Sequence, residues 1–127
     1  MTIRLAQIAD IPGLLALLLQ VGQVHHELRP DIFRPGTLKY DDAALTELLQ
    51  DETRPVFVAM DGDFVAGYCF CVHKEYQDNS AHTDRRELYI DDLCVDENRR
   101  GQGIASQLYR HVVDYAKNSS CRFITLN

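Results

Sequence analysis

The sequence lacks an excess of positive charge. Its 127 residues include 13 lysines and arginines against 19 aspartates and glutamates, which gives a formal net charge of -6. A protein that grips nucleic acid or an anionic membrane through general electrostatics needs the opposite balance. We therefore expect neither a nucleic acid nor a membrane among its partners. The length predicts one domain, residues 1–127, rather than two.

The sequence also lacks the cysteine pairs that are typical of a metal site. Its four cysteines are Cys69, Cys71, Cys94 and Cys121, and none forms a C-x-x-C pair. Cys69 and Cys71 are two residues apart in an apolar run, so on a strand both would face the same side. That spacing suits core packing better than tetrahedral zinc, and unpaired core cysteines suit a reducing compartment. We expect no bound metal.

No segment has the properties of a membrane span or a secretion signal. The most apolar stretch, residues 11–19, is too short to cross a bilayer. It contains Pro12 and Gly13, follows Asp10, and leads to no cleavage site of small residues. The predicted location is therefore the cytoplasm. Repeats, low-complexity tracts and domain linkers are absent as well.

Hydrophobic periodicity predicts an α+β domain. We expect strands over residues 3–7, 55–60, 64–73, 87–95 and 122–126, and helices over about 10–24, from Asp41, and over about 103–118. Asp10 and Asp41 are the predicted caps of the first two helices. The three middle strands should be antiparallel, and the last strand–helix–strand should be a right-handed parallel crossover. Residues 25–36 and 74–85 should be connections.

A charged, glycine-rich loop precedes the last predicted helix. The stretch from residue 96 to 106 reads DENRRGQGIAS, with Arg99 and Arg100 running into Gly101 and Gly103. The backbone N–H groups at a helix start have no partners and carry a partial positive charge, so they attract anions, phosphate above all. Glycines let the backbone approach such a ligand closely. The loop therefore predicts a diphosphate cradle, with an ordinary glycine-capped surface turn as the alternative.

Two common phosphate-binding motifs do not fit this loop. A P-loop needs Gly-Lys-Ser/Thr where Ile104 and Ala105 stand, and a dinucleotide fingerprint needs a third glycine where Ser106 stands. Residues 100–105, RGQGIA, match [R/Q]-x-x-G-x-[G/A] instead. With a strand reading IDDLCVDE before it and an amphipathic helix after it, this loop resembles the pyrophosphate loop of the GNAT superfamily of acetyl-CoA-dependent N-acetyltransferases. The order of the predicted elements resembles that family along the whole chain.

The resemblance implies a GNAT-type fold, with a mixed, mainly antiparallel central sheet flanked by helices. It also implies acetyl-CoA as co-substrate and no metal. In the family the pantetheine arm lies along the strand before the loop, and the loop holds the pyrophosphate. The residues that this assigns to the cofactor, with the charge of Arg99 added, are Leu93, Cys94, Val95, Arg99, Arg100, Gly101, Gln102, Gly103, Ile104, Ala105 and Ser106.

The implied reaction is direct attack of an amine on the thioester in a ternary complex. Asp91 and Asp92 are the candidate bases, and Asp91 is favoured because it takes the place where the family often has glutamate. On a regular strand the two would face opposite sides, so we expect only one of them to reach the acetyl group. Cys94 should line the site without forming an acyl-enzyme. His25 and His26, in a predicted loop, are weaker candidates for contacts with the acceptor.

The chain departs from the family pattern at its end. It stops at Asn127, whereas family members usually continue through a helix and two strands that carry a tyrosine for protonating the thiolate. We therefore expect a C-terminally incomplete domain, with a segment supplied by another chain or a natural short form as alternatives. An unpaired strand edge would favour association, such as a homodimer. The rival functions are a non-catalytic acyl-CoA-binding module and a structural interaction domain.

Overall fold

The computed structural model of the protein describes residues 1–28, 31, 40–76, 85–121 and 123–126. Two short 3-10 turns, η1 (Ile8–Asp10) and η2 (Glu97–Arg99), lie among the longer elements. In chain order those elements are β1 (Thr2–Leu5), α1 (Ile11–Leu28), α2 (Asp42–Leu48), β2 (Val56–Asp61), β3 (Phe64–Tyr76), β4 (Arg85–Val95), α3 (Ile104–Asn118) and β5 (Phe123–Leu126).

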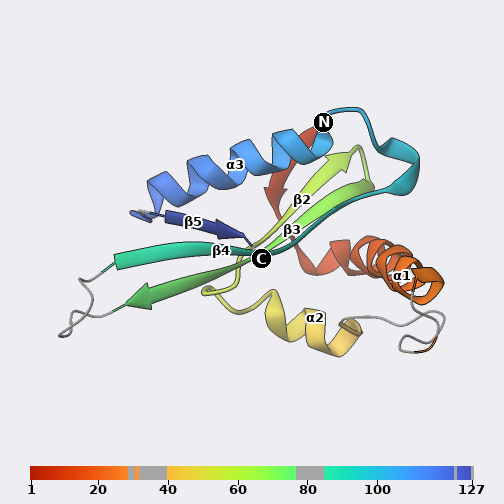
Figure 1. The fold of residues 1–127 in the computed structure, drawn as a ribbon, viewed down its shortest axis with the longest axis horizontal. Helices are drawn as coiled ribbons and strands as arrows, with labels where there is room; N and C mark the ends of the chain where they lie inside the picture. The colour runs from red at the N-terminus through yellow and green to blue at the C-terminus, as the bar shows by residue number, and fades with distance from the viewer. Residues whose placement is uncertain (29–30, 32–39, 77–84, 122, 127) are drawn as a thin grey trace.

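The five strands form one sheet in the order β1-β2-β3-β4-β5. The first three pairings are antiparallel, and β4 pairs with β5 in parallel. Helices α1 and α2 cover one face of this sheet, and α3 covers the other (Figure 1). This arrangement confirms the predicted mixed, mainly antiparallel sheet with a parallel crossover at its end.

Each face of the sheet carries its own core, because successive side chains of a strand point to opposite sides. The α1/α2-side core consists of Ile11, Leu14, Leu17, Leu18, Leu45, Leu48, Val56, Val58, Met60, Val65, Tyr68, Phe70 and Cys94. The α3-side core consists of Phe57, Ala59, Ala66, Cys69, Cys71, Leu88, Ile90, Ile104, Leu108, Val112 and Ala116. Cys69 and Cys71 lie together in the second core, as their spacing predicts.

Strand β4 contains a bulge, and this corrects the expectation that its two aspartates face opposite sides. In the register with β3, Ile90 pairs with Cys71 and Asp92 pairs with Phe70, so Asp91 is the extra residue. A bulge interrupts the strict alternation of a strand. Asp92 therefore falls on the same face as its partner Phe70, which belongs to the α1/α2-side core.

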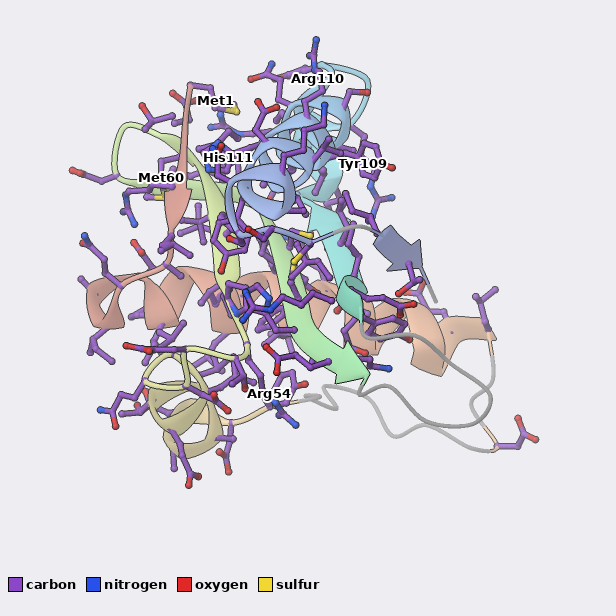
Figure 2. All side chains as sticks on the ribbon, turned by 90° about the vertical axis from the view of Figure 1, so that its left-hand side faces the viewer. Met1, Arg54, Met60, Tyr109, Arg110 and His111 are labelled. Carbon is purple, nitrogen blue, oxygen red and sulfur yellow. The ribbon has the colours of Figure 1, made fainter. Side chains whose placement is uncertain are left out.

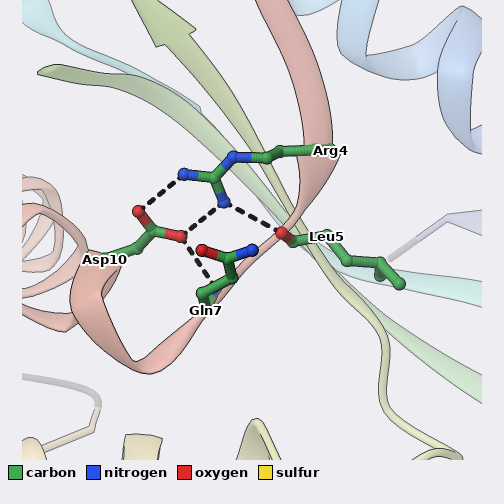
Figure 3. A network of polar contacts seen from close by, with 4 residues as sticks. All are labelled: Arg4, Leu5, Gln7 and Asp10. Atoms are coloured by element: carbon green, nitrogen blue, oxygen red, sulfur yellow. Dashed lines mark hydrogen bonds and ion pairs between the residues drawn. The ribbon is translucent and has the colours of Figure 1, made fainter. Parts of the chain in front are cut away.

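Asp10 does not cap α1 as predicted. Its buried carboxylate binds the guanidinium of Arg4 through two hydrogen bonds of 2.7 and 3.0 Å, and it accepts a third from the backbone N–H of Gln7 at 2.7 Å (Figure 3). It closes the short turn η1 in this way and ties β1 to the start of α1. Asp41 does cap α2, since it accepts a hydrogen bond from the N–H of Ala44 at 2.8 Å.

Two elements run further than the sequence predicts. Helix α1 continues to Leu28, so the backbone of His25 and His26 is helical rather than part of a loop. Nothing between residues 24 and 28 breaks a helix, because the next proline after Pro12 stands at position 30. Strand β3 continues to Tyr76 because it keeps pairing with β4 up to Arg85. The rest of the predicted connections, residues 29–30, 32–36 and 77–84, lies outside the described residues. No helix of the described residues is long and apolar enough to cross a membrane.

Candidate functional site

The loop between β4 and α3 presents an open helix start. Gly101 and Gly103 adopt φ angles of +83° and +79°, which side chains with a Cβ rarely adopt. Gly103 is the N-cap of α3, and no side chain caps this end of the helix. A Cβ at either glycine would meet no atom within 4 Å. Within the described residues no side chain caps this end, and no acceptor is found for the N–H groups of Ile104, Ala105 and Ser106, as an anion site requires.

The packing of α3 fixes where this helix start lies. Its buried residues, Ile104, Leu108, Val112 and Ala116, recur at helical spacing and rest on the sheet. At Gly67 of β3 an added Cβ would lie 3.0 Å from the carbonyl oxygen of Cys94 and 3.2 Å from Leu108. Because β3 has no side chain at this point, α3 comes close to the strand ends. Its first turn thus stands directly beside the end of β4.

A cavity of about 490 Å³ joins this helix start to the end of β4. Most of the residues that the sequence assigns to the cofactor line it: Leu93, Cys94, Val95, Arg99, Arg100, Gly101, Gly103, Ile104, Ala105 and Ser106. Asp92 and Val21 of α1 complete the lining. The structure therefore brings together ten of the eleven predicted binding residues and one of the two predicted bases; Gln102 and Asp91 do not line this cavity.

Within the described residues, no strand pairs with the end of β4 on the β5 side. In the described part of the chain, β5 pairs with β4 only from Glu87 to Ile90. Beyond that point β4 continues to Val95 without β5 beside it (Figure 1). An extended ligand with amide groups can pair with the strand at such a place.

The two arginines of the loop have different surroundings. Arg99 forms an ion pair with Asp61 at the end of β2, and its guanidinium lies 4.5 Å from the ring centroid of Phe64. This ion pair lowers the pKa of Asp61 below its ordinary value. Arg100 is exposed and forms no ion pair within the described residues. Arg99 therefore anchors the loop to the β2–β3 hairpin, whereas the charge of Arg100 is available to a ligand.

A tether from α1 also holds the loop, and sequence reasoning missed it. The side-chain amide of Gln20 donates to the carboxylate of Asp96 at 3.0 Å, and its oxygen accepts from the N–H of Glu97 at 3.1 Å. Asp96 is buried and also accepts from the N–H of Asn98. Since the partners are 76 residues apart in sequence, no local pattern could reveal them.

Asp92 is held by a buried tyrosine. The hydroxyl of Tyr68 donates to Asp92 Oδ2 at 2.8 Å, and Tyr68 is fully buried. Burial, together with the negative charge of Asp92, raises the pKa of Tyr68 far above its ordinary value. Burial and the same charge also raise the pKa of the Cys94 thiol. Near neutral pH both groups therefore remain protonated. A neutral, buried thiol is a poor nucleophile.

Asp91 lines a different recess from Asp92. This smaller hollow of about 140 Å³ is formed by Tyr40, Leu48, Arg54, Phe70, Cys71, Val72 and Asp91. The rings of Tyr40 and Phe70 lie against each other with centroids 5.5 Å apart. The two carboxylates thus open onto neighbouring but distinct hollows. The side chains of His25 and His26 lie outside the described residues. No group of three metal-ligating side chains occurs in the part of the chain that the structure describes.

Comparison with known proteins identifies one family and many solved structures with a similar fold. A family model described as the acetyltransferase (GNAT) family matches residues 22–127. A tetramutant of the BH1408 protein from Bacillus halodurans is 30% identical, has a TM-score of 0.90, and is matched over 100% of this chain and 82% of that chain. A comparison with the curated proteins gives no match.

Two more distant structures share the fold. An acetyltransferase from Vibrio fischeri is 22% identical with a TM-score of 0.78, over 99% of this chain and 96% of that chain. A ribosomal-protein-alanine N-acetyltransferase from Brucella melitensis biovar Abortus 2308 is 23% identical with a TM-score of 0.75, over 99% of this chain and 78% of that chain.

Proposed function

The chain belongs to the acetyltransferase (GNAT) family, and from this premise we propose that it transfers the acetyl group of acetyl-CoA to the nitrogen of a primary amine. Transfer is direct, with both substrates bound at once. The observation that carries the proposal is the single cavity that connects the open start of α3 with the exposed end of β4. Its two ends suit the two ends of one elongated ligand, a diphosphate and an amide-bearing arm that leads to a thioester.

The diphosphate end is formed by the loop and the first turn of α3. The N–H groups of Ile104, Ala105 and Ser106 and the guanidinium of Arg100 supply donors and positive charge. Arg99 and Gln20 contribute indirectly, since they tie the loop to the β2–β3 hairpin and to α1. The pantetheine arm then pairs with the backbone of Leu93 to Val95 as an added strand would.

The reacting end lies at Asp92. In the proposed step the carboxylate of Asp92 takes a proton from the substrate ammonium, directly or through one water. The neutral amine then attacks the thioester carbonyl and the C–N bond forms. The C–S bond breaks, and the proton that the nitrogen loses on becoming an amide passes to the departing thiolate, directly or through water. A backbone N–H at Leu93 or Cys94 stabilises the oxyanion. We assign the base to Asp92 rather than to the favoured Asp91 because Asp92 lines the cofactor cavity.

Asp91 has no chemical part in this proposal, because it lines a separate recess together with Arg54 and does not line the cofactor cavity. Cys94 takes no covalent part, because burial keeps its pKa raised and its thiol neutral.

The cofactor site is tested by charge reversal at Arg100. Arg100→Glu should weaken CoA binding about 10-fold to 100-fold in isothermal titration, since one charge-assisted contact is worth about 1.5–3 kcal/mol. Arg110→Glu is the matched control, because Arg110 is an exposed arginine on α3 that points away from the sheet and does not line the cavity (Figure 2). Equal affinity for CoA in both variants would contradict the site.

Catalysis is tested separately by release of free thiol from acetyl-CoA with a panel of primary amines. The panel should include n-butylamine, putrescine, tyramine, L-lysine and an alanine-initiated peptide. Thiol release with at least one amine, together with an N-acetyl product in the mass spectrum, supports the transferase. CoA binding without thiol release for any amine supports the alternative, a non-catalytic acyl-CoA-binding module.

A further inference from the structure

We propose that Tyr68 is a positioning residue that holds Asp92 in place for proton removal from the amine. The inference rests on the proposed transferase function. It assigns a role to a side chain that does not itself reach the cofactor cavity, since Tyr68 is fully buried and does not line it. It also explains why a single short carboxylate at the end of a strand would have a defined orientation.

Tyr68 occupies a rigid place in the middle of the sheet. It lies on β3 between Val58 of β2 and Cys94 of β4, so a paired strand fixes its backbone on each side. Its ring packs edge-on against Phe70 with centroids 4.8 Å apart. It is among the largest fully buried side chains of the protein. A side chain packed in this way keeps one rotamer, so its hydroxyl stays at one point in space.

The hydroxyl at that point is a reliable donor to Asp92. It donates to Oδ2 at 2.8 Å, and burial and the charge of Asp92 raise the pKa of Tyr68, so the proton stays on the phenol throughout the working pH range. No second donor to Asp92 is found within the described residues. Oδ2 is therefore occupied by Tyr68, and Oδ1 is left to accept the proton of the substrate.

This fixation has a direct chemical consequence. Aspartate has two side-chain torsions, and a carboxylate at the cavity wall would otherwise sample several orientations. Proton transfer needs the acceptor within hydrogen-bond reach of the ammonium, about 2.6–3.2 Å, and a misplacement of about 1 Å can cost about 100-fold in rate. A donor fixed in the core removes that freedom before the substrate arrives.

A purely structural role for Tyr68 predicts something different. If its hydroxyl only satisfied a buried group, losing it would lower stability and would change activity, if at all, independently of Asp92. If it acts through Asp92, its effect must vanish once Asp92 can no longer accept a proton. A double-mutant cycle separates the two, because residues that act as one unit are strongly non-additive.

The experiment compares Tyr68→Phe, Asp92→Asn and the double variant in steady-state kinetics with the best amine of the panel. Tyr68→Phe should lower kcat about 10-fold and leave the KM for acetyl-CoA within about twofold, because the cofactor contacts are intact. Asp92→Asn should lower kcat about 100-fold, within the range typical of a general base. The double variant should be no slower than Asp92→Asn alone.

Tyr115→Phe is the matched control. Tyr115 also has a partly buried hydroxyl in a hydrogen bond, 2.7 Å from His73 Nε2, but it belongs to α3 on the other face of the sheet. Its loss removes the same atom and should leave kcat unchanged. If Tyr68→Phe does not fold in thermal unfolding, 4-fluorophenylalanine at position 68 repeats the test, because fluorine fills the space of the hydroxyl without donating a proton.

The outcomes distinguish this inference from the function on which it rests. Wild-type protein that turns over no amine refutes the transferase function, and the positioning role with it. An active wild type in which Tyr68→Phe keeps full kcat, or in which the two losses add in the double variant, overturns the role of Tyr68 alone. Non-additive losses with unchanged Tyr115→Phe kinetics support it.

Discussion

Two glycines of this protein allow backbone strain to be separated from ligand binding. Gly103, at the start of α3, and Gly62, in the turn between β2 and β3, have φ angles of +79° and +60°. A Cβ at either position would meet no atom within 4 Å. Alanine therefore costs only the strain of the left-handed conformation, about 1–2 kcal/mol. We expect Gly103→Ala and Gly62→Ala to destabilise the protein by similar amounts.

That cost has a measurable size. For a chain of 127 residues, an unfolding entropy of about 2.1 cal/mol/K per residue means that 1 kcal/mol shifts Tm by about 4 °C. Both variants should therefore unfold about 4–8 °C below the wild type in circular dichroism. Only Gly103→Ala adds a methyl group at the start of α3, next to the space that the diphosphate would fill. It should weaken CoA binding at least about 10-fold in isothermal titration, as loss of one charge-assisted contact would.

The comparison can fail in two informative ways. If Gly103→Ala binds CoA as tightly as the wild type, the start of α3 is not the diphosphate site. If Gly62→Ala loses as much affinity as Gly103→Ala, the loss reflects general destabilisation rather than a blocked contact. The titrations should be run well below the Tm of both variants, so that the folded fraction is the same.

Two further predictions concern single groups. The hydrogen bonds from Arg4 lower the pKa of Asp10, so this carboxylate stabilises the fold fully above its unfolded pKa of about 3.9, and the contribution is lost as pH falls through the lower folded value. Asp10→Asn should accordingly show a smaller drop in unfolding free energy between about pH 5 and pH 2 than the wild type; an equal drop would contradict this. Cys94→Ala should retain turnover, and mass spectrometry of wild-type protein incubated with acetyl-CoA should detect no acetylated Cys94; an acetylated thiol would overturn direct transfer.

The sequence was sufficient where the determining signals are local. The loop from Arg99 to Ser106 could be identified because glycines, charge and a helical pattern stand next to one another, and most of its residues line the cavity. The order of the elements along the chain and the antiparallel pairing of the middle strands followed from alternation and turn residues. Asp41 was recognisable as a cap because a cap acts only two or three residues away, at Ala44.

The rest depended on contacts between distant segments. Asp10 matched a helix cap locally, but its partner Arg4 lies on the preceding strand and redirects the carboxylate. Gln20 is an ordinary helix residue until α1 packs beside the loop and brings it to Asp96. The sequence around Tyr68 indicates only a core residue of a strand. The hydrogen bond from its hydroxyl to Asp92, 24 residues further along, is visible only in the structure. Such pairs form only when tertiary packing brings the two segments together, so the sequence around either residue does not reveal them.

The extra residue in β4 shifts the alternation of side chains between the two faces of the sheet by one position. Before Asp91 the even-numbered Leu88 and Ile90 belong to the α3-side core; after it the odd-numbered Leu93 and Val95 pack there. Deleting Asp91 would restore a single alternation and leave Leu93 and Val95 on the face that they now occupy, because their partners on β3 alternate without interruption. The extra residue therefore adds the side chain of Asp91 to the strand without turning Asp92, or the strand end beyond it, away from the faces that they occupy.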